Sequence, residues 1–205
     1  MPMKSDREYR DFRMSADEDA KIVRGYASTF GNAYTLYDTP DLEIREIIDA
    51  RAFDDTDMAD VIMQYNHEGR VFARVSNGTL TVRAEEAGLA IEADLGGTDL
   101  GAQVYQEIKG GYTDKMSIGM RVDKSKDVWE TERAGSKTIE TRTIHRIEKL
   151  YDVSAVSIPA NDATSISVRQ LVDGEIERLT AERLEAERLE LEKRREEVYN
   201  RAVRR

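Results

Sequence analysis

Between residues 21 and 159 the sequence is mostly a succession of short apolar or alternating runs separated by turn residues. Such runs are typical of β-strands, whose successive side chains point to opposite faces of a sheet. The short connections favour antiparallel pairing of neighbouring strands. The strands are predicted at 21–30, 42–48, 61–65, 71–75, 79–84, 89–95, 114–123, 127–132, 137–148 and 150–158.

One segment in this series is predicted to be a helix. Thr98 is a suitable N-cap, and Leu100, Val104 and Ile108 follow at intervals of four residues. Two glycines then end the pattern, and residues 50–60 are expected to supply one or two further helical turns. We therefore predict an α+β fold: a mainly antiparallel, barrel-like sheet with one or two packed helices.

Asn77-Gly78 separates two of the predicted strands, 71–75 and 79–84. Asn-Gly readily adopts the left-handed conformation that a two-residue hairpin turn requires, and it is a strong hairpin signal between alternating runs. We therefore expect these two strands to pair with each other, as part of a meander over residues 71–95.

The two ends of the chain differ from this body in composition. Residues 1–20 are polar and charged, and are predicted to form a flexible N-terminal segment. Residues 174–205 contain nine Glu and nine Lys or Arg, with Arg–Glu pairs four residues apart that stabilise a helix. The predicted organisation is a folded domain over residues 21–173, followed by a charged helical tail over 174–205.

The tail has two interpretations. It is either a solvated single helix or a docking arm for a partner. A heptad spacing of Leu184, Leu191 and Val198 would supply the seam for such docking, including self-association.

The charge distribution argues against nucleic-acid binding. The chain has a net charge of −10, and because residues 174–205 are neutral, the negative excess lies before them. An acidic folded domain repels the phosphates of a nucleic acid.

No apolar run approaches the roughly 20 residues that cross a bilayer, so no membrane segment is expected. There are no cysteines, hence no disulfides or thiolate metal sites. We expect a cytoplasmic protein without a metal or cofactor.

Two reactive side chains accompany strand-like runs. His67, one of two histidines, follows the strand predicted at 61–65, and Ser117 lies among apolar residues where a serine gains little from packing. A histidine base beside a serine hydroxyl is the minimum apparatus for nucleophilic acyl transfer. The strand-to-helix motif Gly-x-Ser-x-Gly is absent, so the serine would lie on a strand. Taken singly, each of these residues is more often structural than catalytic.

A third group usually orients the histidine, and the sequence offers three candidates. Asp152 lies in an otherwise apolar strand, where a carboxylate is costly unless it is paired or exposed. Glu148 lies at the end of the preceding strand, and His145 is the second histidine. Asp152 is the most conspicuous, but the residues alone leave the choice open.

The order and the residue patterns of several segments resemble those of the prohead (procapsid maturation) serine protease family of tailed bacteriophages. The resemblance covers about residues 21–165. Arg51-Ala52 departs slightly from the Gly-Ala that usually precedes Phe53, and Met120 stands where an aromatic residue is common. The matching segments are 25–30, 51–53, 64–67, 88–95 with Thr98, 115–120 and 150–161.

This resemblance implies a serine endopeptidase that cleaves scaffold protein, or the N-terminal segment of the major capsid protein, and then itself. The reaction would take place inside the phage procapsid, in the host bacterial cytoplasm. Ser117 would be the nucleophile, His67 the general base and Asp152 the acidic third member. The family is also similar to herpesvirus assemblin, whose serine acts with two histidines, and that similarity would nominate His145 instead.

Two other functions remain open from the sequence. A non-enzymatic structural or scaffold protein of the phage could share the fold without the chemistry. A hydrolase of small esters is the third possibility.

Overall fold

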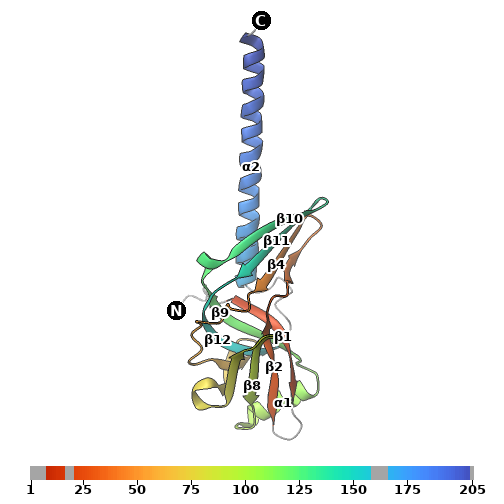
Figure 1. Ribbon diagram of the computed structural model, residues 1–205. Helices are drawn as coiled ribbons and strands as arrows, with labels where there is room; N and C mark the ends of the chain where they lie inside the picture. The colour runs from red at the N-terminus through yellow and green to blue at the C-terminus, as the bar shows by residue number, and fades with distance from the viewer. Residues whose placement is uncertain (1–7, 17–20, 158–165, 204–205) are drawn as a thin grey trace. The chain divides into compact units, whose positions relative to one another are not determined.

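The computed structural model describes residues 8–16, 21–157 and 166–203. The chain divides into two compact units, Met1–Val168 and Arg169–Arg205. Helix α2 (Ile166–Val203) accounts for the described part of the second unit (Figure 1). The first unit contains α1 (Asp99–Lys109) and the strands β1 (Glu8–Ala16), β2 (Ile22–Thr29), β3 (Tyr34–Asp38), β4 (Leu42–Ile48), β5 (Ile62–Tyr65), β6 (Glu68–Arg74), β7 (Leu80–Ala84), β8 (Gly88–Asp94), β9 (Lys115–Val122), β10 (Val128–Ala134), β11 (Lys137–Ile144) and β12 (Ile147–Val156).

These strands form two sheets. The larger sheet has eight strands in the order β6-β5-β12-β9-β1-β2-β8-β7, and the smaller has four in the order β10-β11-β4-β3. Pairing is antiparallel except between β12 and β5 and between β11 and β4. The predicted fold class is confirmed, including the C-terminal helix. The larger sheet keeps two edges, β6 and β7, and so does not close into a barrel.

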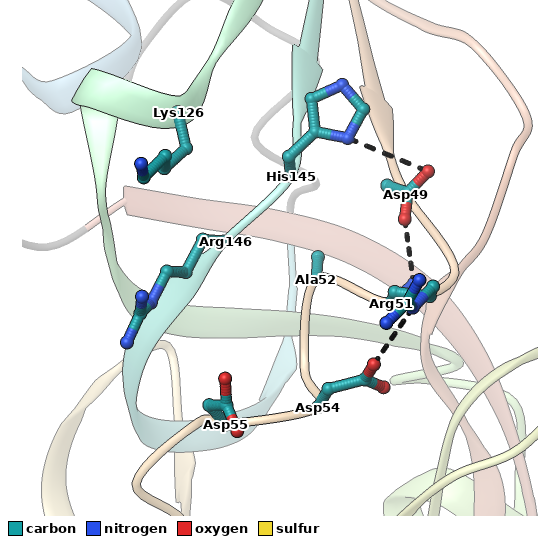
Figure 2. A pocket seen from close by; sticks show the side chains of 8 residues that line it. All are labelled: Asp49, Arg51, Ala52, Asp54, Asp55, Lys126, His145 and Arg146. Atoms are coloured by element: carbon teal, nitrogen blue, oxygen red, sulfur yellow. Dashed lines mark hydrogen bonds and ion pairs between the residues drawn. The ribbon is translucent and has the colours of Figure 1, made fainter.

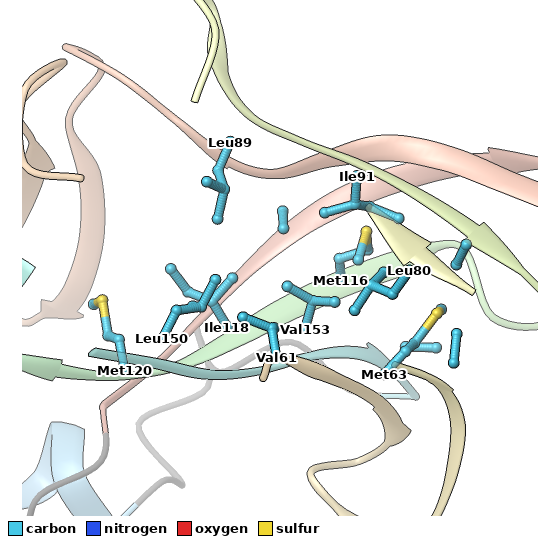
Figure 3. Packing of buried hydrophobic residues seen from close by; sticks show 14 of the residues in the cluster. Val61, Met63, Leu80, Leu89, Ile91, Met116, Ile118, Met120, Leu150 and Val153 are labelled. Atoms are coloured by element: carbon cyan, nitrogen blue, oxygen red, sulfur yellow. The ribbon is translucent and has the colours of Figure 1, made fainter. Parts of the chain in front are cut away.

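The apolar core joins both halves of the larger sheet. Met63 and Val153, on β5 and β12, belong to the same buried cluster as Leu80 and Ile91, on β7 and β8. Figure 3 shows side chains from these strands pointing into one shared space. Burial of each such side chain contributes about 1.5–3 kcal/mol. The sheet therefore curves around one apolar face, and its other face is left for polar side chains.

Residues Glu8–Ala16 form strand β1 in the centre of the larger sheet, between β2 and β9. This differs from the flexible segment that the composition of residues 1–20 predicts. The run is polar, but hydrogen bonding to a neighbour on each side supplies order that its own residues do not signal. Residues 1–7 and 17–20 lie outside the described residues.

The prediction of a hairpin at Asn77-Gly78 is wrong. Residues Val75–Asn77 form a 3₁₀ turn that ends at Gly78, whose φ of 77° is left-handed. The flanking strands β6 and β7 pair with β5 and β8, at opposite edges of the sheet. The Asn-Gly signal therefore marked a left-handed glycine correctly. The intervening 3₁₀ turn redirects the chain, so the two strands do not pair.

The helical turns expected over residues 50–60 are also absent. Residues 51–55 form consecutive turns instead, in which Ala52 N donates to Asp49 O and Asp54 N donates to Arg51 O. Each bond spans three residues and none is continued into a helix. The helix predicted from Thr98 is present as α1, and Thr98 Oγ1 accepts from Gly101 N at 3.0 Å.

The smaller sheet contains a buried cluster of charges. The Arg142 side chain is 1% exposed and lies 3.0 Å from Glu46 Oε2 and 2.6 Å from Asp127 Oδ2. Both carboxylates are almost fully buried as well. Ions in such a place are tolerated because each has an opposite charge in contact.

Replacing Arg142 by leucine is expected to lower the free energy of unfolding by about 3–5 kcal/mol, because two buried carboxylates lose their counter-ion. Urea denaturation at pH 7 measures this difference. Arg121→Leu is the matched control: Arg121 pairs with Glu148 at 2.6 Å, but both side chains are 43% exposed. The control should cost no more than about 1 kcal/mol. Equal losses in the two variants would contradict the role assigned to burial.

Glu43 gives the smaller sheet a dependence on acid pH. Its carboxylate accepts from Arg45 Nε at 2.6 Å and lies 3.1 Å from Lys137 Nζ. The hydrogen bond from Arg45, opposed by burial and assisted by Lys137, lowers the pKa of Glu43 from 4.5 to about 2. Because the folded-state pKa is depressed, this stabilisation is present above pH 4.5 and is lost as the pH falls toward 2.

Glu43→Gln is therefore expected to destabilise the protein by roughly 1–2 kcal/mol at pH 7, after allowance for solvent screening. The difference from the wild type should shrink between pH 4.5 and 2. Urea denaturation at several pH values measures it. Glu130→Gln, on the exposed part of β10, is the control. A constant difference across this range for Glu43→Gln would contradict the assignment.

Candidate active site

A tight turn places His67 at one end of the larger sheet. Tyr65 pairs with Glu68 across the hairpin of β5 and β6, and the two turn residues have left-handed φ values: 49° for Asn66 and 59° for His67. Two positive φ values define the hairpin turn that prefers Asn at its first position. For a histidine this conformation is strained, and such strain is concentrated at functional sites. Asn66 N also donates to Ala155 O at 2.9 Å, so the turn is anchored on β12.

A β-bulge on β12 determines where Asp152 points. Leu150 is opposite Met120 on β9, whereas Asp152 is opposite Gly119, so Tyr151 is one residue too many for the ladder. In an undisturbed strand, residues 150 and 152 would share a face. The extra residue reverses this alternation. Leu150 therefore packs in the apolar core with Met120, while Asp152 lies on the opposite face.

On this opposite face Asp152 meets His67. Asp152 Oδ1 lies 2.5 Å from His67 Nδ1, and the side chains are 2% and 14% exposed. An ionised carboxylate can only accept, so this contact places a proton on Nδ1 and leaves Nε2 as the basic nitrogen. Ser154 Oγ donates to the same Oδ1 at 2.7 Å. The buried carboxylate thus receives two hydrogen bonds on one oxygen.

Ser117 lies on the same face, one strand away. It is directly opposite Ser154 in the antiparallel pairing of β9 with β12. Side chains of opposed residues share a face, with Cβ atoms about 4.5–5.5 Å apart. Its neighbours Met116 and Ile118 point into the core instead. The register therefore brings the Ser117 hydroxyl to the side of the sheet where His67 meets Asp152.

The Ser117 hydroxyl is buried. Ser117 is 1% exposed, and its Oγ has no hydrogen-bond partner among the described residues. The serine and the imidazole are thus on one face without a hydrogen bond between them. Catalytic hydrogen bonds are often long in a free enzyme and tighten when substrate binds.

The other two candidates for the third group make different contacts. Glu148 pairs with Arg121 in an exposed position. His145 lines a pocket of about 360 Å³, where its Nδ1 lies 3.7 Å from Asp49 Oδ2 (Figure 2). Of the three candidates that the sequence offers, Asp152 is the one in contact with His67.

Residues 10–177 of the 205 match the profile of the Caudovirus prohead serine protease family. The chain belongs to this family of caudoviral prohead serine proteases. The matched span begins within β1, so most of this central strand is part of the family domain. No curated protein and no solved structure matches the chain significantly.

In the described part of this prohead protease family member, no group of three or more His, Asp or Glu side chains could hold a metal ion. Its described helices include none that is long and apolar enough to span a membrane.

Sequence reasoning missed two polar residues that hold this site in the family member. Ser154 bonds to Asp152, and Ser157 N donates to Asn66 Oδ1 at 2.9 Å, which ties the histidine turn to the end of β12. The available signal was their position: both are polar residues of the segment that carries Asp152. A serine buried in an apolar strand is costly unless it is bonded, just as the aspartate is.

Proposed function

We propose that this protein is a serine endopeptidase that cleaves scaffold protein, or the N-terminal segment of the major capsid protein, during procapsid maturation. Ser117 is the proposed nucleophile, His67 the general base and Asp152 the group that orients the base. The observation that carries the proposal is the His67–Asp152 contact on the face of the sheet where Ser117 lies. Membership of the prohead serine protease family supports peptide hydrolysis as the reaction.

The proposed reaction follows from the roles of these three side chains. Ser117 Oγ attacks the scissile carbonyl carbon while His67 Nε2 takes the hydroxyl proton. The imidazolium then gives that proton to the leaving amine, and an acyl-enzyme ester remains on Ser117. Water, deprotonated by His67, hydrolyses this ester. Asp152 stays ionised throughout and stabilises the imidazolium through Nδ1–H.

The burial of Ser117 favours an enzyme whose access to substrate is regulated. Because Ser117 is 1% exposed, a peptide reaches its hydroxyl only after a local rearrangement of the chain that covers it. A protease that must not cut its substrates before assembly benefits from such a closed state.

The reaction takes place inside the procapsid in the host bacterial cytoplasm, and it includes self-cleavage. The unit before the tail, with β1 as a central strand, acts as the protease domain, and the helical tail over 174–205 targets the enzyme to scaffold, self-associates or is removed. Neither nucleic acid nor a membrane takes part. A relationship to herpesvirus assemblin would give the third role to His145, so this residue is included among the variants to be tested.

Co-expression with the cognate coat protein, followed by intact mass measurement of both chains, tests the proposed function. The coat or scaffold protein should lose a defined segment, and the enzyme should shorten as well. Unchanged masses of every chain would favour a non-enzymatic structural protein. Turnover of a small p-nitrophenyl ester without cleavage of the coat protein would favour an ester hydrolase.

A further inference from the structure

A second buried serine lies within the candidate active site. Ser154 is 0% exposed, and its Oγ is 2.7 Å from the Asp152 oxygen that also faces His67 Nδ1. We infer that Ser154 is a positioning residue, which holds the Asp152 carboxylate and through it the His67 imidazole in the orientation that Ser117 requires. This inference rests on the proposed function.

The chemistry of the three groups determines the direction of each hydrogen bond. The ionised carboxylate of Asp152 has no proton to give, so both Ser154 Oγ–H and His67 Nδ1–H donate to Oδ1. Two donors converge on this one oxygen, one from β12 itself and one from the turn between β5 and β6, and together they restrict rotation of the carboxylate about its own axis. With His67 as the single donor, the carboxylate and the ring could turn together.

The position of Ser154 in the sheet fixes the place of its hydroxyl relative to Asp152. It lies in the middle of β12, opposite Ser117 on β9 and opposite Gln64 on β5. Ladder hydrogen bonds on both sides fix its backbone, and a site built on paired strands is held more accurately than one built on loops.

The residue type also points to this role. The strand neighbours Val153 and Ala155 are apolar and belong to the core. A fully buried hydroxyl costs free energy unless it is hydrogen-bonded, and the bond that Ser154 makes is to Asp152. An alanine would fill this position without that requirement, so the hydroxyl is explained by the carboxylate that it binds.

Kinetics on the coat protein separate positioning from simple packing. Ser154→Ala should lower kcat about tenfold with KM nearly unchanged, a part of the roughly 10²–10⁴-fold that a positioned base contributes. The shape of the pH–rate profile should change as well, because the Ser154 hydroxyl donates to the same Asp152 oxygen as the His67 ring.

Two sets of variants control this measurement. Ser154→Thr and Ser154→Val introduce side chains of nearly equal volume, but only threonine keeps the hydroxyl. The Thr variant should therefore retain more activity than the Val variant, even if the Ala variant does not fold. Ser28→Ala removes another 0% exposed serine, in β2, whose Oγ bonds to the Thr29 carbonyl oxygen and, among the described residues, to no carboxylate. It should change neither kcat nor the pH profile. Equal activity of the Thr and Val variants would overturn the inference.

Proton NMR tests the same inference without turnover. In full-length protein carrying Ser117→Ala, the His67 Nδ1–H that bridges to Asp152 should give a downfield resonance. Adding Ser154→Val should shift or broaden this signal, whereas adding Ser154→Thr or Ser28→Ala should not. An unchanged signal in the Val variant overturns the positioning role. A changed signal in a protein whose wild type never cuts the coat protein supports the positioning and rejects the proposed function.

Discussion

Replacing Ser117 by alanine is expected to abolish cleavage of the coat protein and leave the fold intact. Loss of the nucleophilic oxygen removes the covalent step, and the rate should fall by about 10⁴–10⁶-fold. Stability should change by no more than about 1 kcal/mol, because the lost hydroxyl is buried and makes no hydrogen bond among the described residues. Intact mass of the coat protein and urea denaturation of the variant measure the two effects.

The matched control for this variant is Ser28→Ala. It removes an equally buried serine from the same sheet, but from β2 rather than from β9, the strand that pairs with the strand of Asp152. Cleavage should continue at the normal rate. If Ser117→Ala also cuts normally, Ser117 is not the nucleophile, and the serine protease mechanism at this site must be abandoned.

Changing Asp152 to asparagine is expected to lower kcat by about 10³–10⁴-fold. Asparagine has nearly the same size, but its amide can present a donor to Nδ1, which would force the proton onto Nε2 and remove the base. KM should change little, because the Asp152 side chain is only 2% exposed and so offers almost no surface for a substrate to contact. Steady-state cleavage of the coat protein at pH 7 measures this loss.

Glu148→Gln and His145→Gln are the comparisons for Asp152→Asn. Both residues are exposed and make their contacts elsewhere, with Arg121 and Asp49. Each variant should keep kcat within about threefold of the wild type, since exposed pairs contribute little. A loss in His145→Gln as large as that in Asp152→Asn would instead favour a serine with two histidines.

Local sequence signals predicted the elements that depend on neighbouring residues. Thr98 begins α1 because its hydroxyl accepts from Gly101 N, a bond between residues three apart. The runs ending before His67 and around Ser117 became β5 and β9. Strand β1 was missed because its order comes from β2 and β9, which lie 6 or more residues away along the chain and are invisible in its own composition.

The sequence by itself determined the residue types of the candidate site and the strands that carry them. It named His67, Ser117 and Asp152 but left the third role open among three side chains. Only the tertiary structure decided which of these meet. Strand alternation has a period of two, so a single inserted residue reverses every face that follows it. The bulge at Tyr151 does this, and it turns Asp152 away from the core and toward His67.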